Sequence, residues 1–508
     1  MWPDASASGH IVNARPNQYR EAYVVFDSAI DQLRYVTSVL LNRPASPTVL
    51  SRIARDMVMT MDEFGAPGED AQLLPGQSGG VDPEVRRTMT SRNLRATARW
   101  AQTTSYYRQV FADTGLSGDR FDLANWTQIP VTPKAALKAM PAAFVSTRVN
   151  PAIQARTTGT TGAPAVIWFS RDEFETMAAL STLGATMQEE LRREHVVAFA
   201  GCSRNTMALT LSMESATRIG AAFVQYGMVE PALVLDALAN PVGLPGKLAQ
   251  ISHLICSSSY LAALVQLAED EGWRPADFGL QSIDVGGEVL TAALGNRALA
   301  ALGARPRSAY LMTEALPYGA ALCQQGHLHF TSELAHVEFL DPQTYQPARP
   351  GELATIVITP LYPYRRCTML LRYVTGDLVR LPVEQPSCEL AQLPATSDIL
   401  GRYTGPGSVR VLTRPLLEAL ERHPSIPLPA RYTVTGEQQL SLHVLSRSDA
   451  EPLRRSILDS LTAAGVPITD VILHTGQDGM PAAMPVRADL RERTFEGTGT
   501  KLDLPVPV

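Results

Sequence analysis

The feature that most restricts the fold of this chain is an alternation of short apolar segments with longer amphipathic ones between residues 195 and 283. The pattern predicts a strand over 195–201, a helix over 207–220 and a strand over 222–226, and it continues in the same way to Ile283. Strands that alternate with helices of this length form a mostly parallel sheet that helices cover on both faces. The sequence therefore predicts an α/β fold, in which ligands bind at loops beyond the carboxyl ends of the strands.

A polar segment, Thr157-Thr-Gly-Thr-Thr-Gly162, lies between Ile153 and the apolar run Val166–Phe169. This arrangement predicts a loop that joins two strands. Glycine lets the backbone approach an anion closely, and the N–H groups and threonine hydroxyls can donate to it, so phosphate is a candidate ligand. A solvated connection is the alternative interpretation. The pattern GxxxxGK[ST] occurs nowhere in the chain, which disfavours a P-loop ATPase.

The composition is that of a globular protein, with 45% hydrophobic and 19% charged residues among 508 and a formal net charge of -6. A small negative charge does not predict a nucleic-acid surface. No apolar run has the length of a membrane span, and the first residues lack the apolar block of a secretory signal. The five cysteines are odd in number and widely spread, which favours a reducing compartment. We therefore expect a cytoplasmic protein, monomeric or homodimeric, without nucleic-acid or membrane partners.

The Thr/Gly segment resembles the phosphate-binding loop of the adenylate-forming superfamily, which includes acyl-coenzyme A synthetases, adenylation domains and luciferases. Further segments resemble motifs of that superfamily in its own order: Gly286-Gly-Glu288, Tyr310-Leu-Met-Thr-Glu314, Gly351-Glu-Leu with Thr359, Arg372-Tyr-Val-Thr-Gly-Asp377 and Gly401-Arg402. Two earlier segments, Tyr106-Tyr-Arg108 and Ile129-Pro-Val-Thr-Pro-Lys134, are similar to the phenylacetate-coenzyme A ligase branch. Motifs in a fixed order are more specific than any single match.

The resemblance implies ATP and Mg²⁺ as cofactors and assigns residues to them. An aromatic ring can stack on adenine, a carboxylate can accept two ribose hydroxyls, and magnesium prefers carboxylate and phosphate oxygens. The implied ligands are Thr157, Thr158, Gly159, Thr160, Thr161 and Gly162 for the β- and γ-phosphates, Gly286, Gly287, Glu288 and Tyr310 for adenine, Thr313 for the α-phosphate, Glu314 for magnesium, Asp377 for ribose and Arg402 for the domain arrangement.

Members of the superfamily also use a lysine near the C-terminus that neutralises charge on the substrate carboxylate and α-phosphate. The candidate here is Lys501, the only lysine after Lys247. The usual proline-x-threonine lead-in is missing, and a solvated charge is the alternative. The implied catalytic residues are therefore Lys501, Thr313 and Glu314.

A second group of residues, Cys323, His329, Cys367 and Cys388, is a candidate zinc site, because sulfur and imidazole suit tetrahedral zinc. Some members of the phenylacetate ligase branch carry a structural zinc in a similar place. Their zinc ligands include a Cys-x-Cys pair, whereas this chain has a single cysteine there, in Ser387-Cys388. Free buried cysteines that pack as small hydrophobic residues are the alternative interpretation.

We expect three regions in the chain. Residues 1–135 form an N-terminal helical region, of which roughly the first 70 residues are additional to the family; residues 136–402 form the adenylate-forming core with mostly parallel sheets and the ATP site; and residues 403–508 form a small mobile α+β domain. Rotation at about Thr404 would move Lys501 into the active site for the first step and out of it afterwards.

The resemblance implies that the chain activates a carboxylic acid, expected to be aryl or arylacetic, to an acyl-adenylate and transfers the acyl group to coenzyme A. One alternative is a stand-alone adenylating enzyme of a biosynthetic pathway that passes its adenylate to a carrier protein, an amine or another small nucleophile. Another is a non-catalytic protein that binds adenine nucleotides.

Overall fold

A computed structural model describes residues 17–64, 83–116, 121, 123–157, 164–187, 190–201, 207–308, 310–388, 390–403, 411–436, 438–476 and 481. Its centre is a five-stranded parallel sheet with the order β4-β3-β5-β6-β7. The strands are β3 (Val196–Ala200), β4 (Ala222–Gln225), β5 (His253–Cys256), β6 (Ser282–Val285) and β7 (Pro306–Ser308). The predicted alternation of strands and helices is therefore confirmed, with every residue of β3 buried as a central strand requires.

Helices cover both faces of this sheet. On one face, α8 (Pro231–Ala239), α9 (Ser258–Glu271) and α10 (Ala292–Leu302) share a hydrophobic core with the strands. On the other face, α7 (Met207–Ile219) packs through Ala216 against Val197. The chain moves from one side of β3 to the other between β4 and β5. In open α/β sheets the carboxyl ends of strands at such a reversal are the usual place for a ligand.

The Thr/Gly segment lies where the sequence predicted it, between the strands of an antiparallel hairpin, β1 (Ile153–Arg156) and β2 (Val166–Phe169). Helix α6 (Arg171–Met187) follows at once. A capping box opens it: the Ser170 hydroxyl accepts from the Glu173 N–H at 3.2 Å, and the Glu173 carboxylate accepts from the Ser170 N–H at 2.7 Å. The other oxygen of Glu173 accepts from the N–H groups of Arg366 and Cys367 at 2.7 and 3.0 Å. This buried carboxylate therefore ties the start of α6 to a distant segment.

Two four-stranded antiparallel sheets follow the parallel one. The first has the order β14-β10-β9-β8, and the second has the order β11-β12-β13-β15. Short turns such as the one between β9 and β10 join neighbouring strands directly, and this connection gives antiparallel pairing. The strands are β8 (Tyr310–Leu311), β9 (Gly319–Leu322), β10 (His327–His329), β11 (Ala335–Leu340), β12 (Leu353–Pro360), β13 (Tyr373–Arg380), β14 (Ala395–Ser397) and β15 (Gly401–Arg402).

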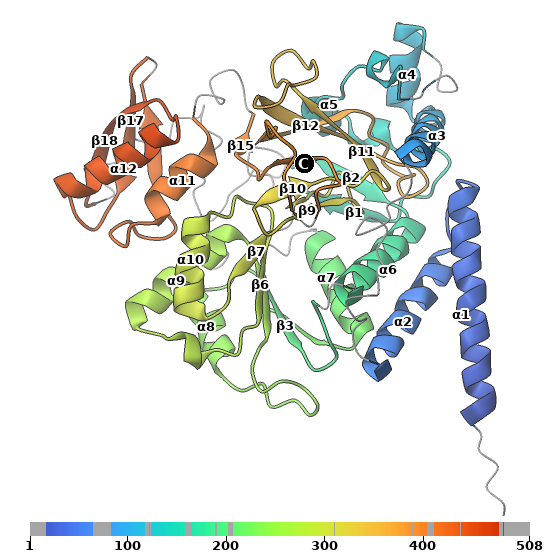
Figure 1. Cartoon of the computed structure of the whole chain (residues 1–508), viewed down its shortest axis with the longest axis horizontal. Helices are drawn as coiled ribbons and strands as arrows, with labels where there is room; N and C mark the ends of the chain where they lie inside the picture. The colour runs from blue at the N-terminus through green and yellow to red at the C-terminus, as the bar shows by residue number, and fades with distance from the viewer. Residues whose placement is uncertain are drawn as a thin grey trace, which may run out of the picture.

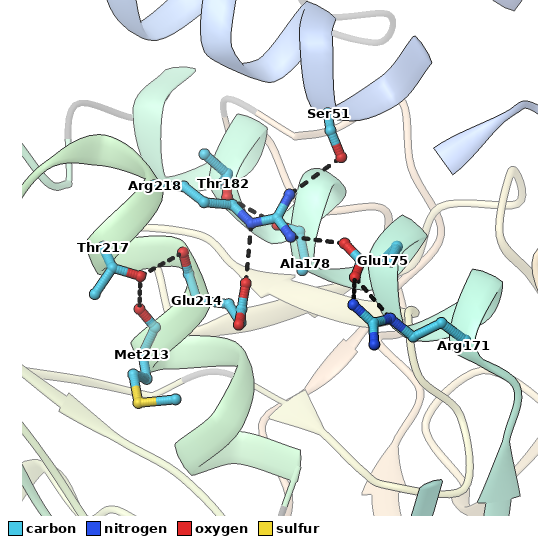
Figure 2. A network of polar contacts seen from close by, with 9 residues as sticks. All are labelled: Ser51, Arg171, Glu175, Ala178, Thr182, Met213, Glu214, Thr217 and Arg218. Carbon is cyan, nitrogen blue, oxygen red and sulfur yellow. Dashed lines mark hydrogen bonds and ion pairs between the residues drawn. The ribbon is translucent and has the colours of Figure 1, made fainter. Parts of the chain in front are cut away.

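The N-terminal region is helical, and its first helices lie along one side of the molecule (Figure 1). Its helices are α1 (Asn17–Leu40), α2 (Pro47–Phe64), α3 (Pro83–Ala101), α4 (Ser105–Thr114) and α5 (Lys134–Ala139), with short 3-10 turns at Trp126–Gln128 and Pro141–Phe144 and a later one at Pro275–Asp277. Helix α2 packs on α6 and α7. Figure 2 shows Arg218 of α7 donating to Ser51 of α2, Glu175 of α6 and Glu214 at 3.1, 2.9 and 3.1 Å, so one guanidinium joins three helices.

The C-terminal segment packs around a hydrophobic cluster that also includes Val289 of the turn after β6. The segment consists of α11 (Thr413–Glu421), β16 (Tyr432–Thr435), β17 (Leu440–Leu445), α12 (Glu451–Ala463) and β18 (Ile468–His474). Glu418 of α11 accepts from the N–H groups of Ala292 and Ala293 at 2.6 and 3.0 Å, and this places a carboxylate at the positive N-terminus of α10. Among the described residues, no helix has the length and apolar character needed to cross a bilayer. The domain boundaries at residues 135 and 402 stay predictions.

The Glu173 clamp makes a testable prediction. Replacing Glu173 with Ala leaves buried donors on Ser170, Arg366 and Cys367 without their acceptor, so we expect the free energy of unfolding to fall by about 3–5 kcal/mol. Asp172→Ala, at a neighbouring side chain that is 63% exposed, should cost less than about 0.5 kcal/mol. Urea denaturation followed by circular dichroism measures both. Equal losses in the two variants would show that the clamp does not stabilise the fold.

Candidate active site

The neck of the Thr/Gly loop is closed by Thr157. Its N–H donates to the Ala165 carbonyl at 3.1 Å, and its hydroxyl accepts from the Ala165 N–H at 3.0 Å. The other predicted phosphate ligands, Thr158, Gly159, Thr160, Thr161 and Gly162, lie outside the described residues, as does Lys501. The described hairpin therefore fixes the base of this loop.

Glu314 forms a buried ion pair with a lysine that sequence reasoning did not assign to the site. Glu314 is 1% exposed, and its Oε1 lies 3.1 Å from Nζ of Lys134. The Tyr373 hydroxyl donates to the same oxygen at 3.0 Å. Burial and the adjacent Glu314 carboxylate raise the pKa of Tyr373 well above its ordinary value, so the hydroxyl stays protonated and donates its hydrogen bond to Glu314.

Long-range strand pairing brings Lys134 to this position. Thr132 donates its N–H to the Arg372 carbonyl at 2.8 Å, and its own carbonyl accepts from the Val374 N–H at 3.0 Å, so the segment before α5 pairs with the start of β13. The Arg372 guanidinium donates to the carbonyls of Thr127 and Ile129 at 3.0 and 2.6 Å. The motif that contains Arg372 therefore positions the earlier segment that carries Lys134.

Asp377 lies on β13 directly opposite Arg402 on β15. Arg402 donates to Asp377 Oδ1 from Nε at 3.0 Å and from Nη2 at 2.9 Å, and the Tyr310 hydroxyl donates to Oδ2 at 2.9 Å. The charge of Asp377 raises the pKa of Arg402 further above its ordinary value, and burial followed by Asp377 raises the pKa of Tyr310. The three predicted ATP ligands Tyr310, Asp377 and Arg402 are thus brought together.

Lys138 lies one turn after Lys134 on α5, and together they are two of the four lysines in the chain. Burial, with the charges of Lys134 and Arg402, lowers the pKa of Lys138, while Glu314 acts in the opposite direction. Lys138 therefore lies within electrostatic range of both ion pairs. Lysine is scarce in this sequence, and its scarcity could have identified Lys134 and Lys138 as candidate site residues.

The Gly286-Gly287-Glu288 turn lies at the carboxyl end of β6, as the resemblance implied. Gly287 has a φ of +78°, a conformation that favours glycine. The Glu288 carboxylate accepts from the N–H of Ser259 at 2.8 Å and from its hydroxyl, at the start of α9. The turn is thereby fixed to the neighbouring strand–helix junction, and the Glu288 side chain has a structural partner.

Thr313 lies in the turn after β8 and is partly exposed, next to Glu314. Magnesium, which the resemblance implies, takes carboxylate and phosphate oxygens. Glu314 is the described residue whose chemistry fits this ion, and a magnesium ion bound there would share the carboxylate with Lys134 and Tyr373.

A cluster of sulfur and imidazole groups lies where β9 turns into β10. The ligand atoms of Cys323, His327 and His329 all lie within 4.8 Å of one another, and Cys323 Sγ is 3.6 Å from Nδ1 of His327. A tetrahedral zinc separates its sulfur and nitrogen ligands by about 3.6 Å. Cys388 reaches the cluster from a separate segment, with its Sγ 3.2 Å from Nε2 of His329. The donor set fits zinc.

The cluster in the structure differs from the predicted zinc ligand set at two residues. His327, which the sequence argument did not name, lies two residues before His329 on β10, where side chains i and i+2 share a face. Cys367 is elsewhere: its N–H donates to Glu173, its carbonyl accepts from Ser146, and burial raises the pKa of its thiol to about 12. Cys367 therefore behaves as a buried apolar residue.

Comparison with known proteins supports the fold. Neither a protein-family model nor a curated protein matches the chain. Among solved structures, 2-hydroxyisobutyryl-CoA ligase in the postadenylation state with 2-HIB-AMP is 18% identical, with a TM-score of 0.66 over 84% of this chain and 92% of that one. Its open conformation with 2-HIB-AMP and CoA is 18% identical and scores 0.57 over 78% and 90%. Its thioesterification state is 18% identical and scores 0.56 over 83% and 94%.

At this identity the likeness shows the fold. The predicted α/β fold is therefore confirmed, and it is the fold of 2-hydroxyisobutyryl-CoA ligase. The narrower placement in the phenylacetate-coenzyme A ligase branch is not confirmed by these structures and stays a prediction.

The buried ion pair at the site can be tested by a double-mutant cycle. Lys134→Met leaves the Glu314 carboxylate buried without its cation, so we expect the free energy of unfolding to fall by about 3 kcal/mol. Adding Glu314→Gln removes the unpaired charge. The loss of stability in the double variant should therefore be smaller than the sum of the losses in the two single variants, by at least about 1 kcal/mol. Denaturant titration of the four proteins gives the coupling. Strict additivity would contradict the ion pair.

Proposed function

We propose that the chain activates a carboxylic acid with ATP to form an acyl-adenylate and then transfers the acyl group to coenzyme A. The observation that carries the proposal is that two segments that resemble ATP-binding motifs hold acid–base pairs, Glu314 with Lys134 and Asp377 with Arg402, in a chain whose Thr/Gly segment joins the two strands of a hairpin. The fold shared with 2-hydroxyisobutyryl-CoA ligase, whose structures contain an acyl-adenylate and CoA, supports it.

In the first step, the substrate carboxylate attacks the α-phosphorus of ATP, the bond from that phosphorus to the bridging oxygen breaks, and pyrophosphate leaves. The work of the protein is positioning and charge neutralisation. Lys134 and Lys138 would face the negative charge that accumulates on the phosphates, and Tyr373 would hold Glu314 in place. Magnesium bound at Glu314 would neutralise further phosphate charge.

Asp377 would orient the ribose. Its two oxygens already accept hydrogen bonds from Arg402 and Tyr310, but a carboxylate has about four acceptor positions, so ribose hydroxyls can add to these partners. Tyr310 would lie against adenine, next to the Gly286-Gly287-Glu288 turn. Arg402 at the end of β15 would couple this nucleotide contact to the segment that leads into the C-terminal region.

In the second step, the thiol of coenzyme A attacks the acyl carbonyl and AMP leaves. We propose that the C-terminal region turns about Thr404 between the steps, with Lys501 present only in the first. Both residues lie outside the described part of the chain. An aryl or arylacetic acid stays our first choice of substrate, and transfer to a carrier protein or an amine is the second candidate for the acceptor.

We also propose a structural zinc held by Cys323, His327, His329 and Cys388. The ligand atoms of Cys323, His327 and His329 lie within 4.8 Å of one another, and Cys388 Sγ lies 3.2 Å from Nε2 of His329, which supports the proposal. Zinc there would join the β9–β10 turn to the segment that carries Cys388, and thus stabilise the sheet that begins with Tyr310.

Pyrophosphate release tests the reaction. A panel of aryl, arylacetic, hydroxy, fatty and amino acids with Mg-ATP, each with and without coenzyme A, should give release that depends on one class of acid, and the thioester should be visible by mass. Lys134→Met and Lys501→Ala each remove a cation from the transferring phosphate, so we expect kcat/KM for release to fall at least about 100-fold.

Lys247→Met is the matched control. Its ammonium donates to the carbonyls of Arg193 and Gly220 at the amino edge of the parallel sheet, opposite the site, so release should be unchanged. If pyrophosphate release depends on an acid but does not change when coenzyme A is added, the acceptor would be a molecule other than coenzyme A. No ATP binding at all would refute the proposed function.

Metal analysis tests the zinc site. Protein purified without chelators should contain close to one zinc per chain, and Cys323→Ser and His327→Ala should each lose most of it, because a closed structural site needs all four ligands. Cys367→Ser should keep its zinc, since Cys367 lies outside the cluster. Zinc-free wild-type protein, or loss of zinc in the Cys367 variant alone, would contradict this ligand set.

A further inference from the structure

The three cations that are paired with acids in the candidate active site differ in how many of their donors are used. Arg372 donates from Nε and Nη2 to a carboxylate and from Nη1 to two backbone carbonyls. Arg402 holds Asp377 from two nitrogens. Among the contacts between described residues, the ammonium of Lys134 has one acceptor, Glu314 Oε1, although an ammonium carries three donors. Of the three, Lys134 is therefore held by the fewest contacts.

The Glu314 carboxylate is the group that an ammonium and a divalent cation would both claim. Its Oε1 already accepts from the Tyr373 hydroxyl at 3.0 Å and pairs with Lys134, and Lys138 adds a positive charge within electrostatic range. Magnesium prefers carboxylate and phosphate oxygens. A second cation on the same buried carboxylate is repelled by the ammonium, because like charges interact strongly where water is excluded. Each cation should therefore weaken the binding of the other.

The backbone that carries Lys134 is fixed, and its side chain has room to move. The pairing of Thr132 with Arg372 and Val374 holds the segment before α5 in place. The Lys134 side chain is 22% exposed, whereas that of Glu314 is 2% exposed. A lysine ammonium ends a flexible four-carbon stem. The ammonium can therefore turn from the carboxylate to another anion while the backbone of α5 stays where it is.

We propose that Lys134 is a resident cation, which occupies Glu314 in place of a metal ion until the nucleotide binds, a role that rests on the proposed function. In the nucleotide-free protein the ammonium neutralises the buried carboxylate. When ATP enters with its divalent cation, Lys134 gives up Glu314 to that cation and turns to the phosphates. The carboxylate stays paired throughout, and the ammonium keeps free divalent ions off the site while ATP is absent.

The alternative is an ion pair between Lys134 and Glu314 that never opens. Removing the ammonium from a permanent structural pair would lower the stability of the protein and would create no metal site. Removing a resident cation would lower the stability as well, but it would also leave a carboxylate that binds a divalent ion. The two cases therefore differ in how a variant without the ammonium responds to metal.

Binding of Mn²⁺ to the nucleotide-free, full-length protein tests the proposal, because manganese takes the same oxygen ligands as magnesium and its binding is measured by electron paramagnetic resonance. Lys134→Met should bind Mn²⁺ at least about 10-fold more tightly than the wild type, as the loss of a competing cation implies. Lys134→Arg, which keeps the charge, should bind no more tightly than the wild type. Adding Glu314→Gln to Lys134→Met should abolish the gain.

Thermal melting gives a second measurement on the same proteins. Saturating Mn²⁺ should raise the Tm of Lys134→Met, since a ligand that binds the native state stabilises it, and should leave the wild type nearly unchanged. The matched control is Lys247→Met, which should respond like the wild type, because Lys247 donates to two backbone carbonyls and to no acid. If melting shows that Lys134→Met does not fold, Lys134→Gln, which also removes the charge, takes its place.

Equal affinities for Mn²⁺ in the wild type and Lys134→Met, or a gain that persists after Glu314→Gln, would overturn the resident-cation role. Calorimetry of Mg-ATP binding to the wild type separates this outcome from a failure of the proposed function. Wild-type protein that binds Mg-ATP while the Mn²⁺ affinities are equal would refute the role of Lys134 alone. Wild-type protein that binds no Mg-ATP would refute the proposed function, and the role of Lys134 with it.

Discussion

The pairing of Thr132 with the start of β13 is the constraint on which the rest of the site depends. Two backbone hydrogen bonds and the Arg372 guanidinium hold the segment before α5 against a strand that comes far later in the chain. This pairing places Lys134 at Glu314, and β13 then carries Asp377 to Arg402. One strand therefore positions both halves of the proposed ATP site, so that a shift of its register would separate each acid from its base.

Three acids of this region are each paired with a cation, and an unpaired buried carboxylate there would cost several kcal/mol. Glu314 has Lys134, Asp377 has Arg402, and Arg372 has Glu338 at 2.9 Å. Such pairs are weak evidence for added stability, but they fix geometry, and a site that must bind a triphosphate benefits from cations held in place before the ligand arrives. The same pairs leave little freedom for either acid to move.

The regions at the two ends of the chain are attached to the core by side chains of a few residues. Arg218 joins α2 to α6 and α7, and Glu418 joins α11 to the N-terminus of α10. The first attachment is a network of hydrogen bonds under an additional helical layer. The second consists of contacts that a rotating C-terminal region would have to release and form again.

The sequence by itself determined the elements and their order. Periodicity gave the alternating strands and helices, the capping box at Ser170 gave the start of α6, and the Thr/Gly segment gave a hairpin loop, because these depend on neighbours within a few residues. The tertiary structure alone decided that Lys134 pairs with Glu314 and that Cys388, not Cys367, approaches His329. These outcomes depend on which distant strands form hydrogen bonds with each other, and residue types along the chain do not specify that pairing.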